Sequence, residues 1–409
     1  MTISINNRFR LFFAVQFAGI GIFFPYIALY LNSIGLSGAQ VGLLLALVPL
    51  TAFLVQPLWG MAIDINHQHR LALVLACVSV CVVMLIYANV TQFWLLLLLT
   101  MLHALMMAPL QILVTALALE HLARQESQAR QESQARQESQ ARQESQARQE
   151  SKTGFGSLRL WGSIGFAIST FGIGALFVDA GTVWWILPLY ALGNLILGLI
   201  AYTFPDADVH GQASWREGIG LLRQERPFLW FLLGLLLLGM TLGIANNYIA
   251  VYVVDIGGAG WVIGAALAIS ALCEVPLLAK VQTFINCWGV RLMLLVGAAI
   301  LPVRWLLFAI NHQPLAVLPI QATHSIAMMS LLVVAVLYVD RLLEPKWRTS
   351  GQALYTSSLH SVGPGIGLYL GGLLYGWNGI QAVWLFCLAV SLLGVGILVY
   401  AMYGQPKRD

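Results

Sequence analysis

Residues 21–35 read GIFFPYIALYLNSIG, and residues 243–257 read GIANNYIAVYVVDIG. More than half of the aligned positions are identical at one constant offset, and the similarity continues downstream, where Gly38 aligns with Gly260. Shared glycine and tyrosine positions indicate a repeat more strongly than shared apolar residues do, because apolar residues recur in every membrane segment. The pattern therefore predicts a duplicated unit.

Both copies lie in apolar runs long enough to cross a bilayer, which takes about 20 helical residues. The composition, with 59% hydrophobic and 9% charged residues, excludes a soluble globular domain. It predicts an all-α membrane protein. Twelve runs are expected to span the membrane, six in each copy: 11–31, 41–62, 71–88, 93–117, 159–178, 183–204, 228–254, 261–280, 292–310, 315–339, 352–375 and 382–402.

Lysine and arginine are distributed unevenly among the gaps between these runs. The odd-numbered gaps, such as 32–40 and 255–260, contain neither residue. The even-numbered gaps and both ends of the chain contain the rest, except Arg159 and Arg304, which lie at the edge of a run or inside one. Because positively charged loops stay in the cytoplasm, we expect both termini to be cytoplasmic.

The chain divides into an N-terminal six-helix half (1–204), a cytoplasmic linker (205–227) and a C-terminal six-helix half (228–409). Residues 124–151 repeat the hexad RQESQA, in which arginine and glutamate balance, so they predict a low-complexity cytoplasmic insert rather than a lipid-binding patch. Two parallel six-helix halves are typical of transporters whose site lies near the midplane between the halves.

The loop at 60–70, GMAIDINHQHR, resembles the signature between the second and third helices of the major facilitator superfamily. It keeps Gly60, Asp64 and Arg70, although the usual central basic residues are missing. The resemblance implies alternating access by rocking of the halves in a bacterial inner (plasma) membrane. It also implies a role for these three residues in a cytoplasmic gate.

Further motifs resemble the branch that holds the 3-phenylpropionate transporters and the lactose permease. They include GSLRLWGSIGF at 156–166 and GQALY at 351–355, and the matches span most of the chain. The resemblance implies that Arg159 and Phe166 bind substrate. The fourth helix carries Val-Thr-Ala at 114–116, without the sugar-binding carboxylate of the lactose permease, so a galactoside is not expected.

Glu274 is the carboxylate deepest in an apolar run, and Arg304 is the comparably deep cation. Ionisable groups there are costly, so we expect Glu274, Arg304 and His324 to serve proton coupling, with Glu274 as the carrier. A structural ion pair between Glu274 and Arg304 is the alternative. The other intramembrane histidines, His103 and His360, are interpreted as packing residues.

Two tyrosine pairs lie one helical turn apart, and two asparagines add amide groups to the seventh run. They are candidate substrate-binding residues, and an aromatic belt at the outer interface is the alternative for the tyrosines. The set is Tyr26, Tyr30, Asn246, Asn247, Tyr248 and Tyr252.

The sequence predicts a secondary transporter, working as a monomer, that couples a small organic solute to protons. An aromatic acid such as a phenylpropionate-like compound is the first choice of substrate. A nucleoside or oligosaccharide symporter, a proton-driven exporter and a non-transporting solute receptor are the alternatives.

We expect no enzyme, because no nucleophile with a base or nucleotide loop is present. No cofactor, metal or nucleic acid is expected either, since the histidines at 67 and 69 beside Asp64 are a weak zinc pattern.

Overall fold

The computed structural model describes residues 4–66, 69–111, 113–115, 117–118, 120–122, 160–179, 181–205 and 225–404. Within these ranges all regular structure is helical. In the described part of the chain, ten helices are long and apolar enough to cross a membrane. Helix α5 (Phe93–Met107) and a break at Gly379 in the longest helix account for the remaining two predicted runs. The predicted all-helical membrane fold is confirmed. The insert at 124–151 and most of the linker lie outside the described residues.

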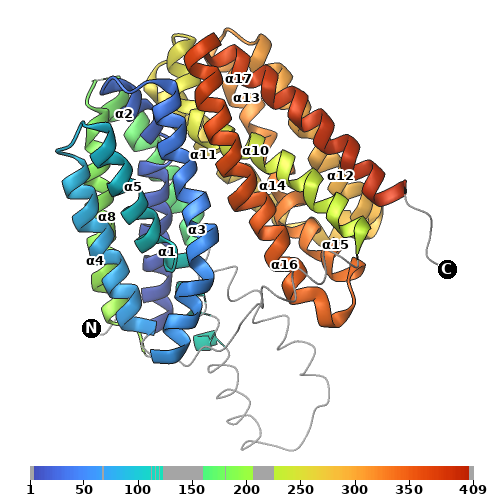
Figure 1. The fold of residues 1–409 in the computed structure, drawn as a ribbon, viewed down its shortest axis with the longest axis horizontal. Helices are drawn as coiled ribbons and strands as arrows, with labels where there is room; N and C mark the ends of the chain where they lie inside the picture. The colour runs from blue at the N-terminus through green and yellow to red at the C-terminus, as the bar shows by residue number, and fades with distance from the viewer. Residues whose placement is uncertain are drawn as a thin grey trace, which may run out of the picture.

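The first part of the chain forms one bundle (Figure 1). Its helices are α1 (Ile5–Phe23), α2 (Ile27–Ser33), α3 (Gly38–Asn66), α4 (His69–Tyr87), α5, a helix over Leu160–Val178 whose last turn is the π-helical η1 (Gly174–Val178), η2 (Val183–Trp185) and α8 (Ile186–Tyr202). Pro25 separates α1 from α2, because proline has no N–H to continue the helical hydrogen bonds.

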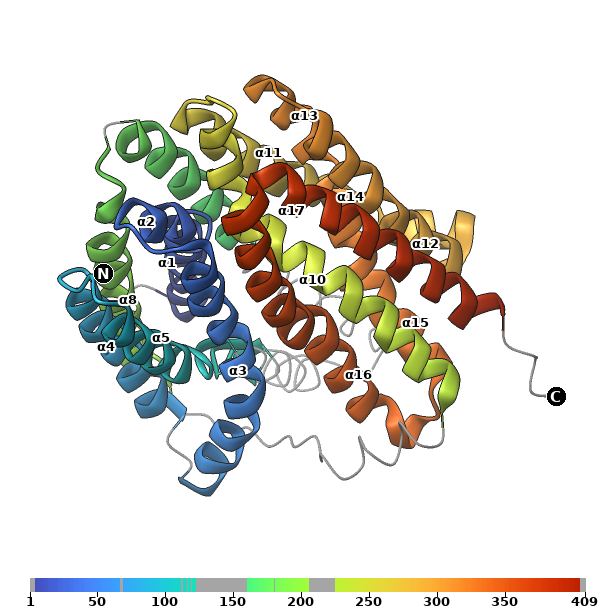
Figure 2. The ribbon, with the colours of Figure 1, turned by 45° about the horizontal axis from the view of Figure 1, so that its top comes forward.

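The second part of the chain forms the other bundle (Figures 1 and 2). Its elements are α10 (Arg226–Asp255), α11 (Gly260–Ala279), α12 (Val281–Ile310), η3 (Pro314–Ala316), α13 (Val317–Ala322), α14 (His324–Met329), η4 (Ser330–Val334), α15 (Ala335–Leu342), η5 (Pro345–Trp347), α16 (Arg348–Ser357), η6 (Ser358–Val362) and α17 (Gly363–Tyr403). Gly289 in α12 and Gly379 in α17 each have φ of 74° and mark sharp changes of direction.

The outward faces of both bundles are apolar. Ile168 and Leu199 of the first bundle and Leu393 of the second are 68%, 65% and 58% exposed, although each lies in a helix that could span a membrane. In water such surfaces would be unfavourable, whereas lipid is as apolar as they are. The exposed apolar faces therefore fit contact with the bilayer.

The repeat found in the sequence is also a repeat of backbone geometry. Gly35 ends α2 with φ of 85°, and Gly257 follows α10 with φ of 77°. The amide N–H of residue 36 donates to the carbonyl of Leu31, and that of Gly258 donates to the carbonyl of Val253 at the equivalent position. This is the glycine-terminated helix end in which a left-handed residue satisfies the last carbonyls. The same turn therefore starts the second span of each half.

Glycines let the two bundles touch at the end where these turns lie. Helix α3 of the first bundle lies beside α17 of the second (Figure 2), and a Cβ added at Gly38 would lie 2.5 Å from the carbonyl oxygen of Gly372. At the repeat-related position, a Cβ added at Gly260 would collide with the backbone of Gly174. Both helix crossings therefore bring backbone directly against backbone.

A hydrogen bond reinforces the second crossing. The N–H of Gly260, at the first turn of α11, donates to Oδ1 of Asp179 in the other bundle at 2.5 Å. A carboxylate at a helix N-terminus also interacts favourably with the helix dipole. By the positive-inside pattern this end of the molecule is external, so the structure has its external side closed.

We predict that Gly38→Leu opens the external side. The helices at the α3–α17 crossing would have to separate by about 1 Å for a contact of 2.5 Å to become an ordinary contact of 3.4 Å. Spin labels on cysteines introduced at the exposed Asn89 and His312, in a background without the five native cysteines, should report a longer distance.

Gly193→Leu is the matched control, because a Cβ at Gly193 meets no atom within 4 Å. An unchanged distance distribution in Gly38→Leu would contradict the role given to the crossing.

Candidate functional site

A cavity of about 350 Å³ lies between the two bundles. Its volume falls within the range of about 300–1,000 Å³ that small-molecule sites occupy. Both halves supply its walls, with α1 to α5 on one side and α10, α14, η6 and α17 on the other. The polar or aromatic residues that line it are Phe23, Phe24, Gln56, Tyr87, Thr100, His103, Gln111, Asn246, Asn247 and His360.

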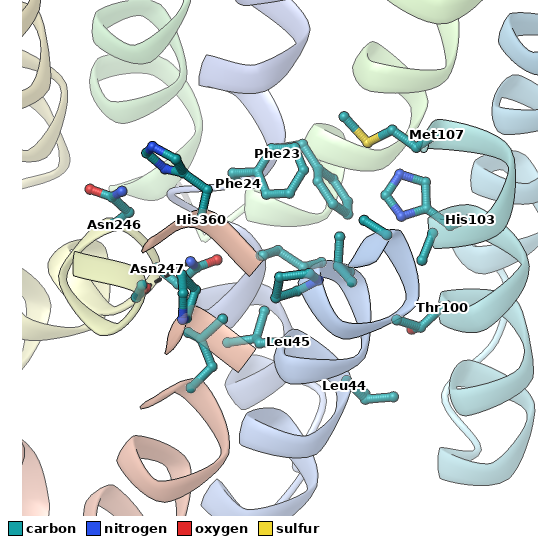
Figure 3. A pocket seen from close by; sticks show the side chains of 18 of the residues that line it. Phe23, Phe24, Leu44, Leu45, Thr100, His103, Met107, Asn246, Asn247 and His360 are labelled. Atoms are coloured by element: carbon teal, nitrogen blue, oxygen red, sulfur yellow. Dashed lines mark hydrogen bonds between the residues drawn. The ribbon is translucent and has the colours of Figure 1, made fainter. Parts of the chain in front are cut away.

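On the N-terminal wall, His103 is tied into the bundle behind it. Its Nε2 lies 3.3 Å from the hydroxyl of Tyr190, and His103 is only 1% exposed. The ring of Phe23 stacks on Tyr190 at 4.6 Å between centroids, which fixes both rings. Phe23 and Phe24 present aromatic surface where α1 ends before Pro25 (Figure 3).

Two further polar pairs belong to the same wall. The hydroxyls of Tyr87 and Thr100 are 3.4 Å apart, and Gln111 accepts a hydrogen bond of 3.1 Å at its Oε1 from Nε2 of Gln16. The amide NH₂ of Gln111 donates to the hydroxyl of Thr115 at 3.5 Å. Hydrogen bonds within the N-terminal bundle thus hold His103, Tyr87, Thr100 and Gln111 in the wall.

The C-terminal wall places two amides beside an imidazole. Asn246 and Asn247 come from α10, and His360 comes from η6 (Figure 3). The local sequence explains the π-helical turn at η6. Pro364 has no N–H to donate to the carbonyl of residue 360, and the N–H of Gly363 donates instead to the carbonyl of Ser358, five residues earlier. Such turns are frequent at functional sites.

None of the described residues that line the cavity is an aspartate, glutamate, lysine or arginine. Its polar groups are amides, imidazoles and hydroxyls, and they are interspersed with aromatic and aliphatic side chains. Burying an unpaired charge is costly, whereas a neutral polar molecule can exchange hydrogen bonds with such a wall. The described part of the cavity therefore suits an uncharged ligand.

The four candidate tyrosines lie in the cores of the two bundles and do not line this cavity. The hydroxyl of Tyr26 donates to the carbonyl of Thr170 at 2.6 Å, and that of Tyr252 donates to the carbonyl of Phe308 at 3.0 Å. The buried hydroxyl of Tyr248 has no partner among the described residues, and Tyr30 is 3% exposed. Asn246 and Asn247, by contrast, line the cavity.

The structure brings Arg304 and His324 into contact. A guanidinium nitrogen of Arg304 lies 3.1 Å from Nδ1 of His324, and another donates to Oε1 of Gln321 at 2.9 Å. Arginine can only donate, so this nitrogen of His324 must be the acceptor. Arg304 also lies over the ring of Trp305, 4.7 Å from its centroid. These groups lie behind the wall, and Glu274 on α11 is half-buried and lies outside the lining too.

The remaining candidates are only partly described. Phe166 is half-buried against the main apolar core and does not line the cavity, and Arg159 lies outside the described residues. Gly60 and Asp64 fall in the helical backbone of α3, but their side chains lie outside the described part. Arg70 lies 5.9 Å from the ring centroid of Tyr202. The substrate-binding, coupling and gate assignments stay predictions.

Sequence reasoning missed several lining residues. His103 and His360 were interpreted as packing residues, yet both line the cavity. The proline at 364 is the signal that could have singled out His360. A proline four residues after His360 has no N–H to donate, so the carbonyl of His360 lacks its usual helical hydrogen bond. No comparable local signal marks Gln56, Gln111 or Phe24.

We predict that Arg304→Lys destabilises the protein by about 1–3 kcal/mol, because lysine lacks the planar fork that reaches both His324 and Gln321. Thermal unfolding in detergent should show the loss. Arg291→Lys is the control, since Arg291 is exposed and lies 5.9 Å from the ring centroid of Tyr403. Equal melting temperatures for Arg304→Lys and the wild type would show that the fork is not needed.

Comparisons with known proteins identify the family. The model of the MFS_1 like family matches residues 7–386. A maltose permease of Geobacillus stearothermophilus is 27% identical over 403 residues, covering 98% of this chain and 95% of that protein. A transporter of Bacillus subtilis (strain 168), YwbF, is 22% identical over 97% of this chain and 93% of its own length.

Solved structures agree in fold. The nucleoside transporter NupG matches with a TM-score of 0.80 at 16% identity, over 99% of this chain and 100% of that chain. A bacterial homologue of the iron transporter ferroportin, in an inward-facing state, matches with a TM-score of 0.72 at 15% identity, over 98% of this chain and 100% of that one. The chain belongs to the MFS_1 like family and is a membrane transporter of the major facilitator superfamily, not an enzyme.

Proposed function

We propose that this transporter carries a neutral solute with ring hydroxyls, an oligosaccharide or a nucleoside, across a bacterial inner membrane. The observation that carries the proposal is the uncharged lining of the cavity between the halves. Amides, imidazoles and hydroxyls can bond to sugar hydroxyls, and aromatic rings such as those of Phe23 and Phe24 can pack against a sugar or base.

The comparisons support the same solute class. One similar protein is a maltose permease, and one similar structure is that of a nucleoside transporter. Maltose and nucleosides share a neutral sugar ring. An aromatic acid is less suited to the described lining, because its carboxylate would meet no cation there, and Arg304 lies behind the wall with His324 and Gln321.

Proton symport by a monomer remains part of the proposal. His324 accepts a hydrogen bond from Arg304 at Nδ1, so a proton bound at that nitrogen would break the bond and place two cations side by side. Protonation of this site and the Arg304–His324 contact are therefore mutually exclusive. Glu274, the other intramembrane candidate, would then carry the proton that His324 cannot hold beside Arg304.

We predict that purified protein in liposomes moves maltose or uridine and does not move 3-phenylpropionate. A pH-sensitive dye inside the vesicles should report proton entry on addition of the transported solute. Movement of 3-phenylpropionate alone would replace the neutral-solute proposal with an aromatic-acid one. Binding of a solute without flux in either direction would instead indicate a receptor.

We predict that Glu274→Gln abolishes proton-driven accumulation of the solute but leaves solute exchange across the membrane, since the glutamine side chain does not titrate and so cannot carry a proton. Counterflow of labelled solute measures exchange without a proton gradient. Glu344→Gln is the control, because the side chain of Glu344 is 67% exposed and pairs with Lys346 at the surface. Accumulation that persists in Glu274→Gln would show that the proton is carried elsewhere.

A further inference from the structure

Most polar groups of the cavity already have partners inside their own half. His103 bonds to Tyr190, Gln111 bonds to Gln16, and the hydroxyls of Tyr87 and Thr100 approach each other. These bonds fix the side chains of the N-terminal wall. They also reduce what that wall can offer to a ligand, because each bond uses a donor or acceptor.

His360 and Asn246 differ from these residues. Both side chains are exposed and both line the cavity, so their exposure is to the cavity itself. Neither forms a hydrogen bond within the described part of the chain. The ring of His360 lies nearly perpendicular to that of Tyr355, with 6.5 Å between centroids, whereas Asn247, next to Asn246, donates to the carbonyl of Gly243 at 2.9 Å. Gln56, on the opposite wall, likewise forms no hydrogen bond with any described residue.

The backbone that carries His360 is held in place from behind. A Cβ added at Gly239 of α10 would lie 2.6 Å from the carbonyl oxygen of Leu359, and one added at Gly363 would lie 2.5 Å from the carbonyl oxygen of Leu236. Direct backbone packing of η6 on α10 therefore sets the position of His360 relative to Asn246. Pre-organised groups bind with less loss of conformational entropy.

Figure 3 shows the result of this arrangement, with His360 and Asn246 on one side of the cavity and Phe23 and Phe24 across from them. A planar or ring-shaped solute could pack on the aromatic surface while its hydroxyls reach the imidazole and the amide. Imidazole and amide each offer both a donor and an acceptor, which matches a pair of neighbouring hydroxyls.

We propose that His360 and Asn246 form the specificity-determining pair of the cavity, binding two ring hydroxyls of the neutral solute by hydrogen bonds. This inference rests on the proposed function. It assigns hydroxyl recognition to the C-terminal half and gives Phe23 and Phe24 of the N-terminal half a non-directional packing role. Because the two walls belong to different halves, a bound solute bridges the interface that must rearrange during transport.

The test measures binding of maltose, and of uridine with its 2′- and 3′-deoxy analogues, to detergent-purified full-length protein by isothermal titration. His360→Leu and Asn246→Leu should each weaken binding of the solute that the wild type recognises by about tenfold, the effect of one lost hydrogen bond. A matching deoxy analogue should bind the leucine variant and the wild type with nearly equal affinity. Monodeoxy derivatives of maltose serve the same purpose if maltose is the ligand.

Two further variants separate recognition from folding. His360→Gln keeps a donor and an acceptor without an imidazole, so it should restore most of the affinity and the preference for the hydroxylated compound. His312→Gln, in an exposed turn that does not line the cavity, should bind as the wild type does. If His360 had only a structural role, replacing it with leucine would weaken the binding of hydroxylated and deoxy compounds equally.

Three results would overturn the inference. Leucine variants that keep both the affinity and the hydroxyl preference would remove His360 and Asn246 from recognition. A loss of affinity that glutamine does not rescue, and that is equal for all analogues, would assign His360 to packing. Wild-type protein that binds none of the neutral probes would remove the proposed function itself, and the specificity pair with it.

Discussion

The close backbone contact at two repeat-related glycine positions is the constraint on which the structure depends. Gly38 of α3 meets α17, and Gly260 of α11 meets the turn at Gly174. Side chains at these points would hold the bundles apart, so glycine is what permits the closed external side. Since the cavity lies between the same two bundles, this contact also decides how its two walls face each other.

Charge and recognition are kept apart inside the C-terminal half. Arg304 is 1% exposed and is bound to His324 and Gln321, while the described cavity wall in front of it is neutral. A buried cation without a carboxylate among its described hydrogen-bond partners is costly, and such groups are usually retained for function. The separation would let a proton act on the bundle without attracting or repelling a neutral solute in the cavity.

The fold could be predicted from the sequence because the patterns that indicate it extend over most of the chain. Twelve apolar runs, one-sided charge and a repeat that includes Gly35 and Gly257 all point to the same architecture, and both glycines have the positive φ that the repeat requires. The site was harder to predict from the sequence. The one-turn spacing of Tyr26 and Tyr30 shows only that the two side chains share a face of the helix. It does not show that this face packs inside the bundle, beyond the break that Pro25 makes.

Asn246 and Asn247, which the sequence predicts as substrate-binding residues, line the cavity, and their binding role stays a prediction. The position of His360 in the cavity wall was not predicted, because a π-helical turn changes which side of the helix a residue faces. The most direct test is a structure determined with the neutral solute bound. Solute hydroxyls are expected about 2.7–3.2 Å from the imidazole of His360 and the amide of Asn246. A solute held instead against Arg304, or outside the cavity between the halves, would contradict this expectation.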